Sequence, residues 1–262
     1  DGKNDMAEQT NQIDAFITQG MDAIILNLVQ TSSADAVIDK IVAAGIPCVL
    51  INREPLAYDA NGNTIDEAYK GILDNPQVCY VGADARQSGS FQGRIIAELP
   101  DHGDINGDGV ISYIMIEGDP ENIDAQYRTQ FSIKYLTDAG YKVECLDDQV
   151  GNWQLAKGQE ICANDLAKFG NKVEVVFCNN DAMAIGAAAA IQAAGRTVGK
   201  DIYLVGVDAL EECQEMVKNG TMTGTVLNDH IGQSHKAVDV TVMLLNGEKI
   251  DNYYWVDYVM VK

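Results

Sequence analysis

The chain has 262 residues, 47% of them hydrophobic, and 18 basic against 39 acidic residues give it a formal net charge of −21. This length is enough for two lobes of about 100–150 residues each. The charge argues against a nucleic-acid partner, since no basic stripe reverses the field, and no apolar run approaches the ~18 residues of a membrane span.

Short apolar runs alternate with amphipathic stretches along the whole chain. The first such stretch places Ile13 and Ile17 on one helical face. Helices are predicted at residues 11–19, 34–44, 84–98, 121–139, 153–169, 181–194, 209–218 and 230–246. Strands are predicted at residues 23–28, 47–51, 78–82, 110–116, 142–146, 174–178, 203–207 and 223–227. Because strands separated by helices form parallel sheets covered on both faces, the predicted fold class is α/β.

Polar or acidic side chains follow several of the predicted strands, as in VVFCNND, YLVGVDAL and TGTVLND. In open parallel sheets, ligands bind beyond the carboxyl ends of the strands. Each of these residues has a simpler role as a helix N-cap, but six of them together favour a polar small-molecule site. They are Asn52, Asn180, Asp181, Asp208, Asn228 and Asp229.

The segment 104–112 fits the first nine positions of a calcium loop, with glycine at the sharp turn. Its oxygen ligands are the side chains of Asp104, Asn106, Asp108 and Ser112 and the backbone carbonyl of Val110. The last position, which needs a bidentate glutamate, holds Met115, and a predicted strand replaces the exit helix of an EF-hand. A carboxylate must therefore come from elsewhere in the chain. A tight turn without metal is the alternative, but the spacing at five positions favours calcium.

Several stretches together resemble the periplasmic glucose/galactose-binding protein family, within the type I sugar-binding proteins. The matching stretches are NDMAEQTNQID, INREP, YVGAD, DINGDG, the Asp124-x-x-x-Arg128 pair, Trp153, VEVVFCNNDAMA, VGVDAL and GTVLND. The resemblance spans almost the whole chain. It implies a monomeric carrier that closes over one hexose, D-glucose or D-galactose, and delivers it to the membrane permease of an ABC transporter. It also implies a chemoreceptor as a further partner, and an extracytoplasmic location, either in the periplasm or lipid-anchored at the outer face of the cell membrane.

The resemblance also assigns functional residues. It implies sugar hydrogen bonds from Asn52, Asp124, Arg128, Asn180, Asp208 and Asn228, and stacking on the apolar face of the sugar by Trp153. It supplies the missing calcium carboxylate from Glu174, in the strand before the NND sequence. Where the family has a histidine two residues before the Asp124 position, this chain has Asn122, which leaves the preference between glucose and galactose open.

Two lobes that exchange the chain three times are a further implication of the resemblance. Lobe one is expected to comprise residues 1–82 and 230–256, and lobe two residues 84–228 and 258–262, with crossovers near 82–84, 228–230 and 256–258. The segment 56–76 is interpreted as a surface insertion. Because the resemblance begins in the family's second β-α unit, we expect lobe one to lack the first β-α unit and to have a vacancy inside its sheet, as in a fragment, unless another segment fills the vacancy.

Two other classes of function are weighed against sugar transport. An enzyme is disfavoured because the three histidines lie outside any nucleophile–base motif, and the sequence has no Walker loop, G-x-S-x-G or G-x-G-x-x-G. A sugar-sensing effector domain related to transcriptional repressors has the same architecture, so fold alone does not separate it from a carrier. The acidity, the calcium loop and the lack of a helix-turn-helix favour the carrier.

The six cysteines form no C-x-x-C pair. Four of them, Cys48, Cys79, Cys145 and Cys178, fall in apolar strand-like runs, where a free thiol behaves as a small hydrophobic group. Buried free thiols are therefore expected, and disulfides stay open because they depend on geometry.

Overall fold

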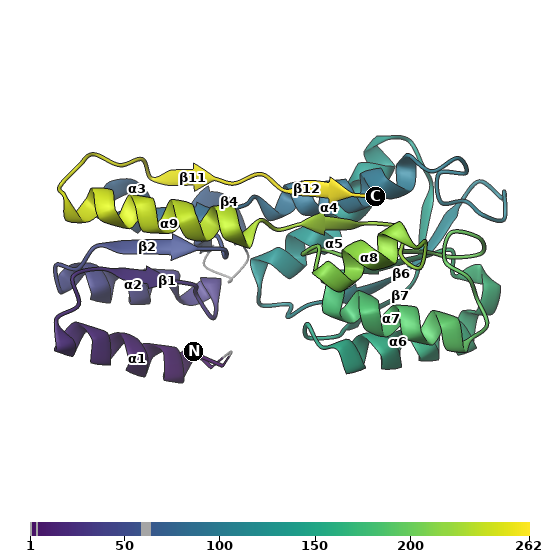
Figure 1. Cartoon of the computed structure of the whole chain (residues 1–262), viewed down its shortest axis with the longest axis horizontal. Helices are drawn as coiled ribbons and strands as arrows, with labels where there is room; N and C mark the ends of the chain where they lie inside the picture. Colours follow the sequence, from purple (N-terminus) through teal and green to yellow (C-terminus); the bar gives the residue numbers. More distant parts are fainter. Residues whose placement is uncertain (1, 4, 59–63) are drawn as a thin grey trace. The chain divides into compact units, whose positions relative to one another are not determined.

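The computed structural model describes residues 2–3, 5–58 and 64–262 and has an α/β architecture of parallel sheets covered by helices (Figure 1). Its contacts divide the chain into two compact units, each described by itself below. Unit 1 comprises Asp1–Asp84 and Asp229–Val256, and unit 2 comprises Ala85–Asn228 and Asp257–Lys262. The chain therefore passes between the units at three points, next to the three crossovers expected from the sequence.

A four-stranded parallel sheet forms the centre of unit 1. Its strands, in spatial order, are β1 (Ile24–Leu26), β2 (Cys48–Ile51), β5 (Val78–Gly82) and β11 (Tyr253–Trp255). Figure 1 shows helix α9 (His230–Leu245) on one side of this sheet and α1 (Met6–Gln19) and α2 (Ala34–Ala43), preceded by the 3-10 turn Thr31–Ser33, on the other. Alternation along β2 divides the core, because Cys48 and Leu50 pack toward α2 whereas Val49 packs toward α9.

Strand β1 lies at the edge of this sheet. It pairs with β2 from Ile24 opposite Cys48 to Leu26 opposite Leu50, and β2 pairs in turn with β5. The predicted vacancy inside the sheet is therefore wrong. Strands that follow one another along the chain are neighbours in most sheets, as β1, β2 and β5 are here.

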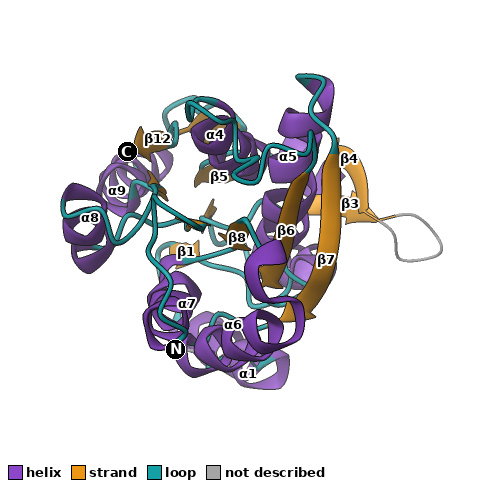
Figure 2. Ribbon diagram, turned by 90° about the vertical axis from the view of Figure 1, so that its right-hand side faces the viewer, coloured by secondary structure: helices purple, strands orange, loops and turns teal. Residues whose placement is uncertain are grey.

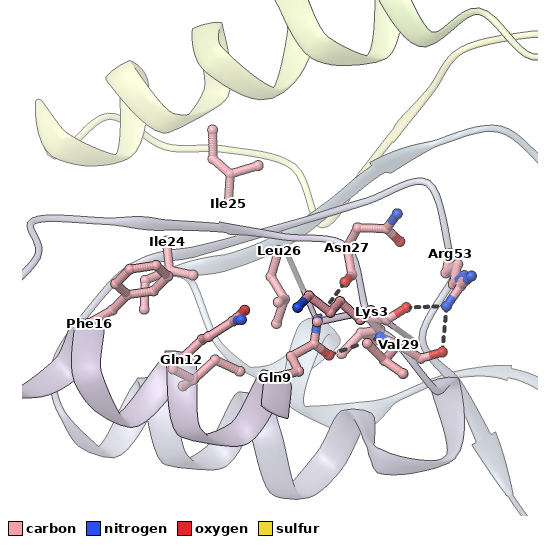
Figure 3. A pocket seen from close by; sticks show the side chains of 13 residues that line it. Lys3, Gln9, Gln12, Phe16, Ile24, Ile25, Leu26, Asn27, Val29 and Arg53 are labelled. Carbon is pink, nitrogen blue, oxygen red and sulfur yellow. Dashed lines mark hydrogen bonds between the residues drawn. The ribbon is translucent and has the colours of Figure 1, made fainter. Parts of the chain in front are cut away.

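A pocket of about 370 Å³ lies along β1 and α1 (Figure 3). Two side chains at its end bind the backbone that follows β1. Gln9 Nε2 donates to the carbonyl of Asn27 (2.8 Å), and Gln9 Oε1 accepts from the amide of Val29 (2.9 Å). Arg53 Nη1 donates to the carbonyl of Leu28 (2.8 Å). Side chains thus satisfy backbone groups that a neighbouring strand would otherwise pair with.

A β-hairpin and a short helix occupy the predicted surface insertion. Strand β3 (Leu56–Tyr58) pairs antiparallel with β4 (Thr64–Ala68), and α3 (Lys70–Asp74) follows, while positions 59–63 of the insertion lie outside the described residues. Ile72 of α3 is fully buried in the same core as Ile38 of α2. The end of the segment is therefore part of the core of unit 1 and not a surface excursion.

Unit 2 contains a second four-stranded parallel sheet. In spatial order its strands are β7 (Val143–Val150), β6 (Ile111–Glu117), β8 (Val175–Cys178) and β9 (Tyr203–Val205), and a separate antiparallel pair is formed by β10 (Thr225–Leu227) and β12 (Val259–Val261). The helices of this unit are α4 (Ala85–Ala97), α5 (Ile123–Asp138), α6 (Leu155–Phe169), α7 (Asp181–Ala193) and α8 (Glu211–Lys218), with a 3-10 turn at Gly170–Lys172. In Figure 2, α4 lies with α5 and α6 lies with α7. One face of the sheet, including Ile114 and Val176, packs against α6 and α7.

The predicted helices and strands are confirmed with shifted ends. Helix α1 differs most, because it begins at Met6 and not near residue 11. Asp5 is its N-cap, and the Asp5 carboxylate accepts the amides of Ala7 (2.8 Å) and Glu8 (3.0 Å). The cap therefore adds a turn before the apolar pattern starts.

All six cysteines are free thiols, and five of them are buried. Cys145 is exposed, so the expectation that it is buried is wrong. It lies on β7, an edge strand of the sheet in unit 2, and no residue of β7 is buried.

Two carboxyl groups of unit 2, Asp165 on α6 and Asp147 on β7, lie close enough to influence the pKa of one another. Asp165 is 1% exposed, and its Oδ2 has no hydrogen-bond partner among the described residues. Burial raises the pKa of Asp165 to about 7, and Asp147 adds to this effect, whereas Lys168 opposes it. Gln149 and the other partners of Asp147 hold the pKa of that carboxyl below its ordinary value.

We expect Asp165 to make unit 2 more stable in mild acid. A carboxyl group with a raised pKa binds its proton more tightly in the folded chain, so this stabilisation is complete below about pH 4 and is lost as the pH rises to about 7. The variant Asp165→Asn imitates the protonated form. It should match the wild type at pH 4.5 and exceed its free energy of unfolding by roughly 2 kcal/mol at pH 8, measured by denaturant unfolding. Equal differences at both pH values would contradict the expectation.

Candidate sugar and calcium sites

The strand ends of unit 2 bring most of the predicted sugar residues to one edge of its sheet. The carboxyl ends of parallel strands meet at the same edge, where the chain continues into loops and helix starts. Helix α5 follows β6, the Trp153 turn follows β7, and the next segments follow β8 and β9. The residues placed there are Asn122, Asp124, Arg128, Trp153, Asn180 and Asp208.

Arg128 has contacts with three different segments of this edge. It is 3% exposed. Its Nη1 donates to the carbonyl of Asn179 (2.9 Å) and lies 3.9 Å from a carboxylate oxygen of Asp208, and its Nη2 donates to the hydroxyl of Tyr258 (3.3 Å). The Nε atom of Arg128 is buried without a hydrogen-bond partner in the part of the chain that the structure describes. Arg128 therefore joins β8, the turn after β9 and the C-terminal segment, and keeps one donor unused.

The charges around Arg128 keep it protonated. Burial by itself lowers the pKa of Arg128, but Tyr258, Asp124 and Asp208 outweigh this effect and raise the pKa above its ordinary value. Burial likewise raises the pKa of Tyr258 to about 12, against the opposing charge of Arg128. At neutral pH Arg128 is therefore a guanidinium, and Tyr258 beside it is a neutral phenol.

The indole ring of Trp153 lies over the backbone at the end of β6. A Cβ atom on Gly118 would lie 2.1 Å from the ring, so only glycine leaves room for it. The guanidinium carbon of Arg128 is 5.8 Å from the ring centre, within the range of a cation–π contact. Trp153 has a φ of 65°, which is uncommon for a residue with a side chain, and its Nε1 is buried with no partner among the described residues. A second buried donor is thus available beside Arg128.

Asn122 and Asn180 act as helix N-caps. The Oδ1 of Asn122 accepts the amide of Asp124 (3.0 Å), and the Oδ1 of Asn180 accepts the amide of Met183 (3.0 Å). The Nδ2 of Asn180 also donates to the carbonyl of Trp153 (3.4 Å). Each oxygen uses one of its two acceptor positions in the cap, so the other acceptor position and the amide nitrogen of each residue are left for the predicted sugar contacts.

Sequence reasoning missed two residues of this group, Asn179 and Tyr258. Asn179 is fully buried, its Oδ1 accepts the amide of Gly118 (2.9 Å), and its Nδ2 donates to Thr129 Oγ1 (3.1 Å). It therefore joins the ends of β6 and β8 beneath Arg128. Asn179 could have been found as the first polar residue after β8, in the NND sequence. Tyr258 lies 130 residues from Arg128, and no local pattern links the two.

The other two predicted sugar residues lie elsewhere. Asn52 belongs to unit 1, at the end of β2, where it has a φ of 66° and its carbonyl accepts from the hydroxyl of Tyr80 (2.7 Å). Asn228 directly follows β10 and is the last residue of unit 2 before the chain enters unit 1. A role of either residue in sugar binding stays a prediction.

The predicted calcium loop folds around the carboxylate of Asp104. Its Oδ1 accepts the amides of Gly107 (2.9 Å) and Asp108 (3.1 Å), and its Oδ2 accepts that of Gly109 (2.8 Å). Gly107 has a φ of 76°, the left-handed conformation that favours glycine at the sharp turn. Asp104, the first residue of the loop, therefore closes it through three hydrogen bonds from backbone amides.

The carboxylate of Glu174, the residue directly before β8, contacts this loop. Its Oε1 accepts the amide of Asn106 and its Oε2 that of Ser112, both at 2.9 Å, and the residue is 1% exposed. Burial raises the pKa of Glu174 above its ordinary value; the two amide bonds oppose this, and the charges of Asp104 and Asp108 add to it. The carboxylate assigned to complete the loop therefore lies against it.

The donors at this loop are oxygen atoms of several kinds. Within the described ranges, no group of three or more His, Cys, Asp or Glu side chains is arranged so that it alone could hold a metal ion. The predicted set does not consist of such side chains alone, because it includes the amide of Asn106, the hydroxyl of Ser112 and the carbonyl of Val110. Calcium at this loop stays a prediction.

Comparison with known sequences identifies related proteins over most of the chain. The family model described as "Periplasmic binding protein domain" matches residues 1–249. The D-galactose/methyl-galactoside binding periplasmic protein MglB of Haemophilus influenzae is 33% identical over 252 residues, which cover 95% of this chain and 71% of that protein. A Rhizobium meliloti protein named for rhizopine binding is 33% identical over 263 residues, covering 100% of this chain and 78% of its own.

A solved structure has the same fold over the whole chain. It is an ABC transporter solute binding protein from Bacillus halodurans with bound myo-inositol, 28% identical, with a TM-score of 0.83 and coverage of 100% of this chain and 82% of that one. No helix in the part of the chain that the structure describes has the length and hydrophobicity to cross a membrane. Sequence and fold agree that the chain belongs to the periplasmic binding protein domain family, with type I architecture.

Proposed function

We propose that the chain binds one neutral sugar, D-glucose or D-galactose, as the substrate-binding component of an ABC uptake system. The observation that carries the proposal is the buried Arg128, with Asp124 and Asp208 as charged neighbours and the ring of Trp153 beside it. The unpartnered Nε of Arg128 and Nε1 of Trp153 are donors that ligand oxygens would satisfy.

A pyranose suits this set of groups. Carboxylates accept from sugar hydroxyls, a guanidinium donates to them, and amides do both. Such charge-assisted hydrogen bonds are stronger than those between neutral groups. An anionic ligand would meet two carboxylates and a chain charge of −21, which favours a neutral polyol. A wrong sugar that leaves one buried group unmatched would lose about 1–3 kcal/mol.

The ligands named for the relatives support a polyhydroxylated compound. They include galactose and myo-inositol for the proteins described above, and ribose and xylitol for two others. We favour glucose or galactose because the INREP, DINGDG and GTVLND stretches resemble the carriers of those hexoses. The protein's preference between glucose and galactose depends partly on Asn122, whose Oδ1 already caps α5.

Hinge closure is the proposed mechanism. Asn52 belongs to unit 1, whereas the other predicted sugar residues belong to unit 2. In this mechanism, binding of one sugar stabilises a closed form, which a membrane permease or a chemoreceptor then recognises. The protein would act as a monomer outside the cytoplasm, in the periplasm or anchored by lipid, and would catalyse no reaction. The matched family is named for binding, which supports this assignment.

The proposal includes a calcium ion at the 104–112 loop. Calcium prefers oxygen ligands, and the loop and its neighbour offer a suitable set. The residues that would hold it are Asp104, Asn106, Asp108, Val110, Ser112 and Glu174. The charges of Asp104 and Asp108 act unfavourably on the buried carboxylate of Glu174, and a divalent cation would relieve this repulsion. The ion would stabilise the loop and take no part in sugar contacts.

Calorimetric titration of the complete protein, with any residues that precede Asp1, tests the sugar assignment. The panel is D-glucose, D-galactose, D-ribose and myo-inositol. We expect a dissociation constant in the micromolar range for one of the first two sugars, about −8 kcal/mol, and at least about tenfold weaker binding of the others. Preferred binding of ribose or myo-inositol would overturn the hexose assignment, and the lack of binding to all four would overturn the proposed function.

A further inference from the structure

Asp181, the first residue of α7, is fully buried beside the candidate sugar residues. Its carboxylate accepts two hydrogen bonds, Oδ2 from the amide of Leu210 (2.8 Å) and Oδ1 from the hydroxyl of Thr225 (2.7 Å). Its amide donates to the carbonyl of Val207 (2.7 Å). Asp181 therefore connects the start of α7 to the turn after β9 and to strand β10.

The turn that Asp181 contacts has an unusual backbone. Asp208 has a φ of 117° and Ala209 a φ of 51°, both in the left-handed range where side chains are disfavoured. The amide of Ala209 donates to Thr225 Oγ1 (3.3 Å), which itself donates to Asp181. Such a conformation persists only where the surroundings impose it. The Asp181 carboxylate and Thr225 provide that restraint on one side of the turn.

The chemistry of Asp181 is that of an internal hydrogen-bond acceptor. Burial raises the pKa of Asp181 to about 7, its bonds from Thr225 and Leu210 oppose the rise, and the charge of Asp208 adds to it. An aspartate at the first turn of a helix is also favoured by the helix dipole. Nothing in the sugar assignment uses Asp181 as a ligand contact, so its burial and its two donors need a separate explanation.

We infer that Asp181 is a positioning residue, whose carboxylate holds the 208–210 turn so that the Asp208 carboxylate stays beside Arg128. The inference rests on the proposed function, because Asp208 is assigned to the sugar. It adds a specific claim, that sugar affinity depends on Asp181 only through Asp208.

Alanine and asparagine variants separate positioning from general stability. Asp181→Ala removes both acceptors and should weaken sugar binding about tenfold, whereas Asp181→Asn still accepts from Leu210 and donates to Thr225, and should stay within about threefold of the wild type. The matched control is Asp165→Ala, which removes another buried aspartate of unit 2 and should change affinity less than about twofold. Thr225→Val removes the hydroxyl at nearly constant shape and provides a second test if Asp181→Ala does not fold.

A double-variant cycle tests the route of the effect. In an Asp208→Asn background, Asp181→Ala should cost less than about twofold in affinity, because the group that it positions is already altered. An equal tenfold loss in both backgrounds, or no loss in the wild-type background, would overturn the inference. Intrinsic tryptophan fluorescence and calorimetry both measure these affinities.

Amide hydrogen exchange of the sugar-free protein decides the matter independently of binding. Asp181→Ala should speed exchange in residues 206–214 by about tenfold or more relative to wild type, and Asp165→Ala should not. If the wild type binds no sugar but this difference is found, the proposed function fails while Asp181 still orders the turn. Unchanged exchange overturns the inference whatever the protein binds.

Discussion

Replacing Arg128 with alanine is expected to weaken sugar binding by at least about 100-fold and to destabilise unit 2 by about 3 kcal/mol. The first effect follows because the variant removes the guanidinium that contacts Asn179, Tyr258 and Asp208. The second follows because the nearby carboxylates lose the cation that compensates them in a buried setting. Calorimetric titration measures the affinity, and denaturant unfolding measures the stability.

Two further variants control this experiment. Arg128→Lys keeps the charge, but one ammonium group does not reproduce the fork that donates to both Asn179 and Tyr258, so we expect a result between wild type and alanine. Lys134→Ala removes a cation from the same helix that forms an exposed pair with Asp138, and should change stability by less than about 0.5 kcal/mol. Sugar affinity of Arg128→Ala within threefold of wild type would show that this cluster is structural only.

The fold was accessible to sequence reasoning wherever an element has its own periodic pattern. Strands such as β5 and β8 are continuous apolar runs, and helices such as α2 have a clear apolar face, so their existence follows from local residues. The hairpin β3–β4 and strand β11 were missed. They are short, and β11 is fixed by pairing with β5, a contact between distant parts of the chain. Local patterns do not record such pairing.

The placement of β1 illustrates the same limit. The alternation of strands and helices correctly predicts a parallel sheet, but it does not give the order of the strands within it. The expected vacancy assumed an order in which a further strand separates β1 from β2, whereas these strands pair directly over their length. Strand order depends on how helices cover the two faces, which only the packed structure reveals.

For the candidate site, residue types at strand ends were informative, and roles within the cluster were not. Asn180 and Asp181 are adjacent and both polar, yet one caps α7 while the other holds the next turn. The sequence offers no means to distinguish these roles, because they depend on the distance to Leu210 and Thr225. The role of Glu174, in contrast, was expected from the sequence. The calcium loop lacks a carboxylate at its last position, and Glu174, assigned to supply it, lies against the loop.

Calcium is expected to raise the melting temperature of the protein by about 10 °C. At a calcium concentration 1,000 times the dissociation constant, binding adds about 4 kcal/mol, and each kcal/mol shifts melting by about 2–4 °C in a protein of this size. Glu174→Gln should remove most of this shift, because an amide lacks the charge and the second acceptor that now hold the Asn106 and Ser112 amides. Melting by circular dichroism with calcium and with a chelator measures the effect.

A carboxylate just outside the loop provides the matched control for Glu174. Asp101 accepts the amide of Gly103 and the hydroxyl of Tyr203, so Asp101→Asn should lower the melting temperature while leaving the calcium shift in place. A wild-type melting temperature that calcium does not change would mean that the amides of the 104–112 loop satisfy its carboxylates without metal. If Glu174→Gln retains the full shift, the ion is bound without the carboxylate that replaces the one missing at Met115. Calcium held jointly by the loop and Glu174 is supported only by one combination of results. The calcium-induced rise in melting temperature must be lost in Glu174→Gln and kept in Asp101→Asn.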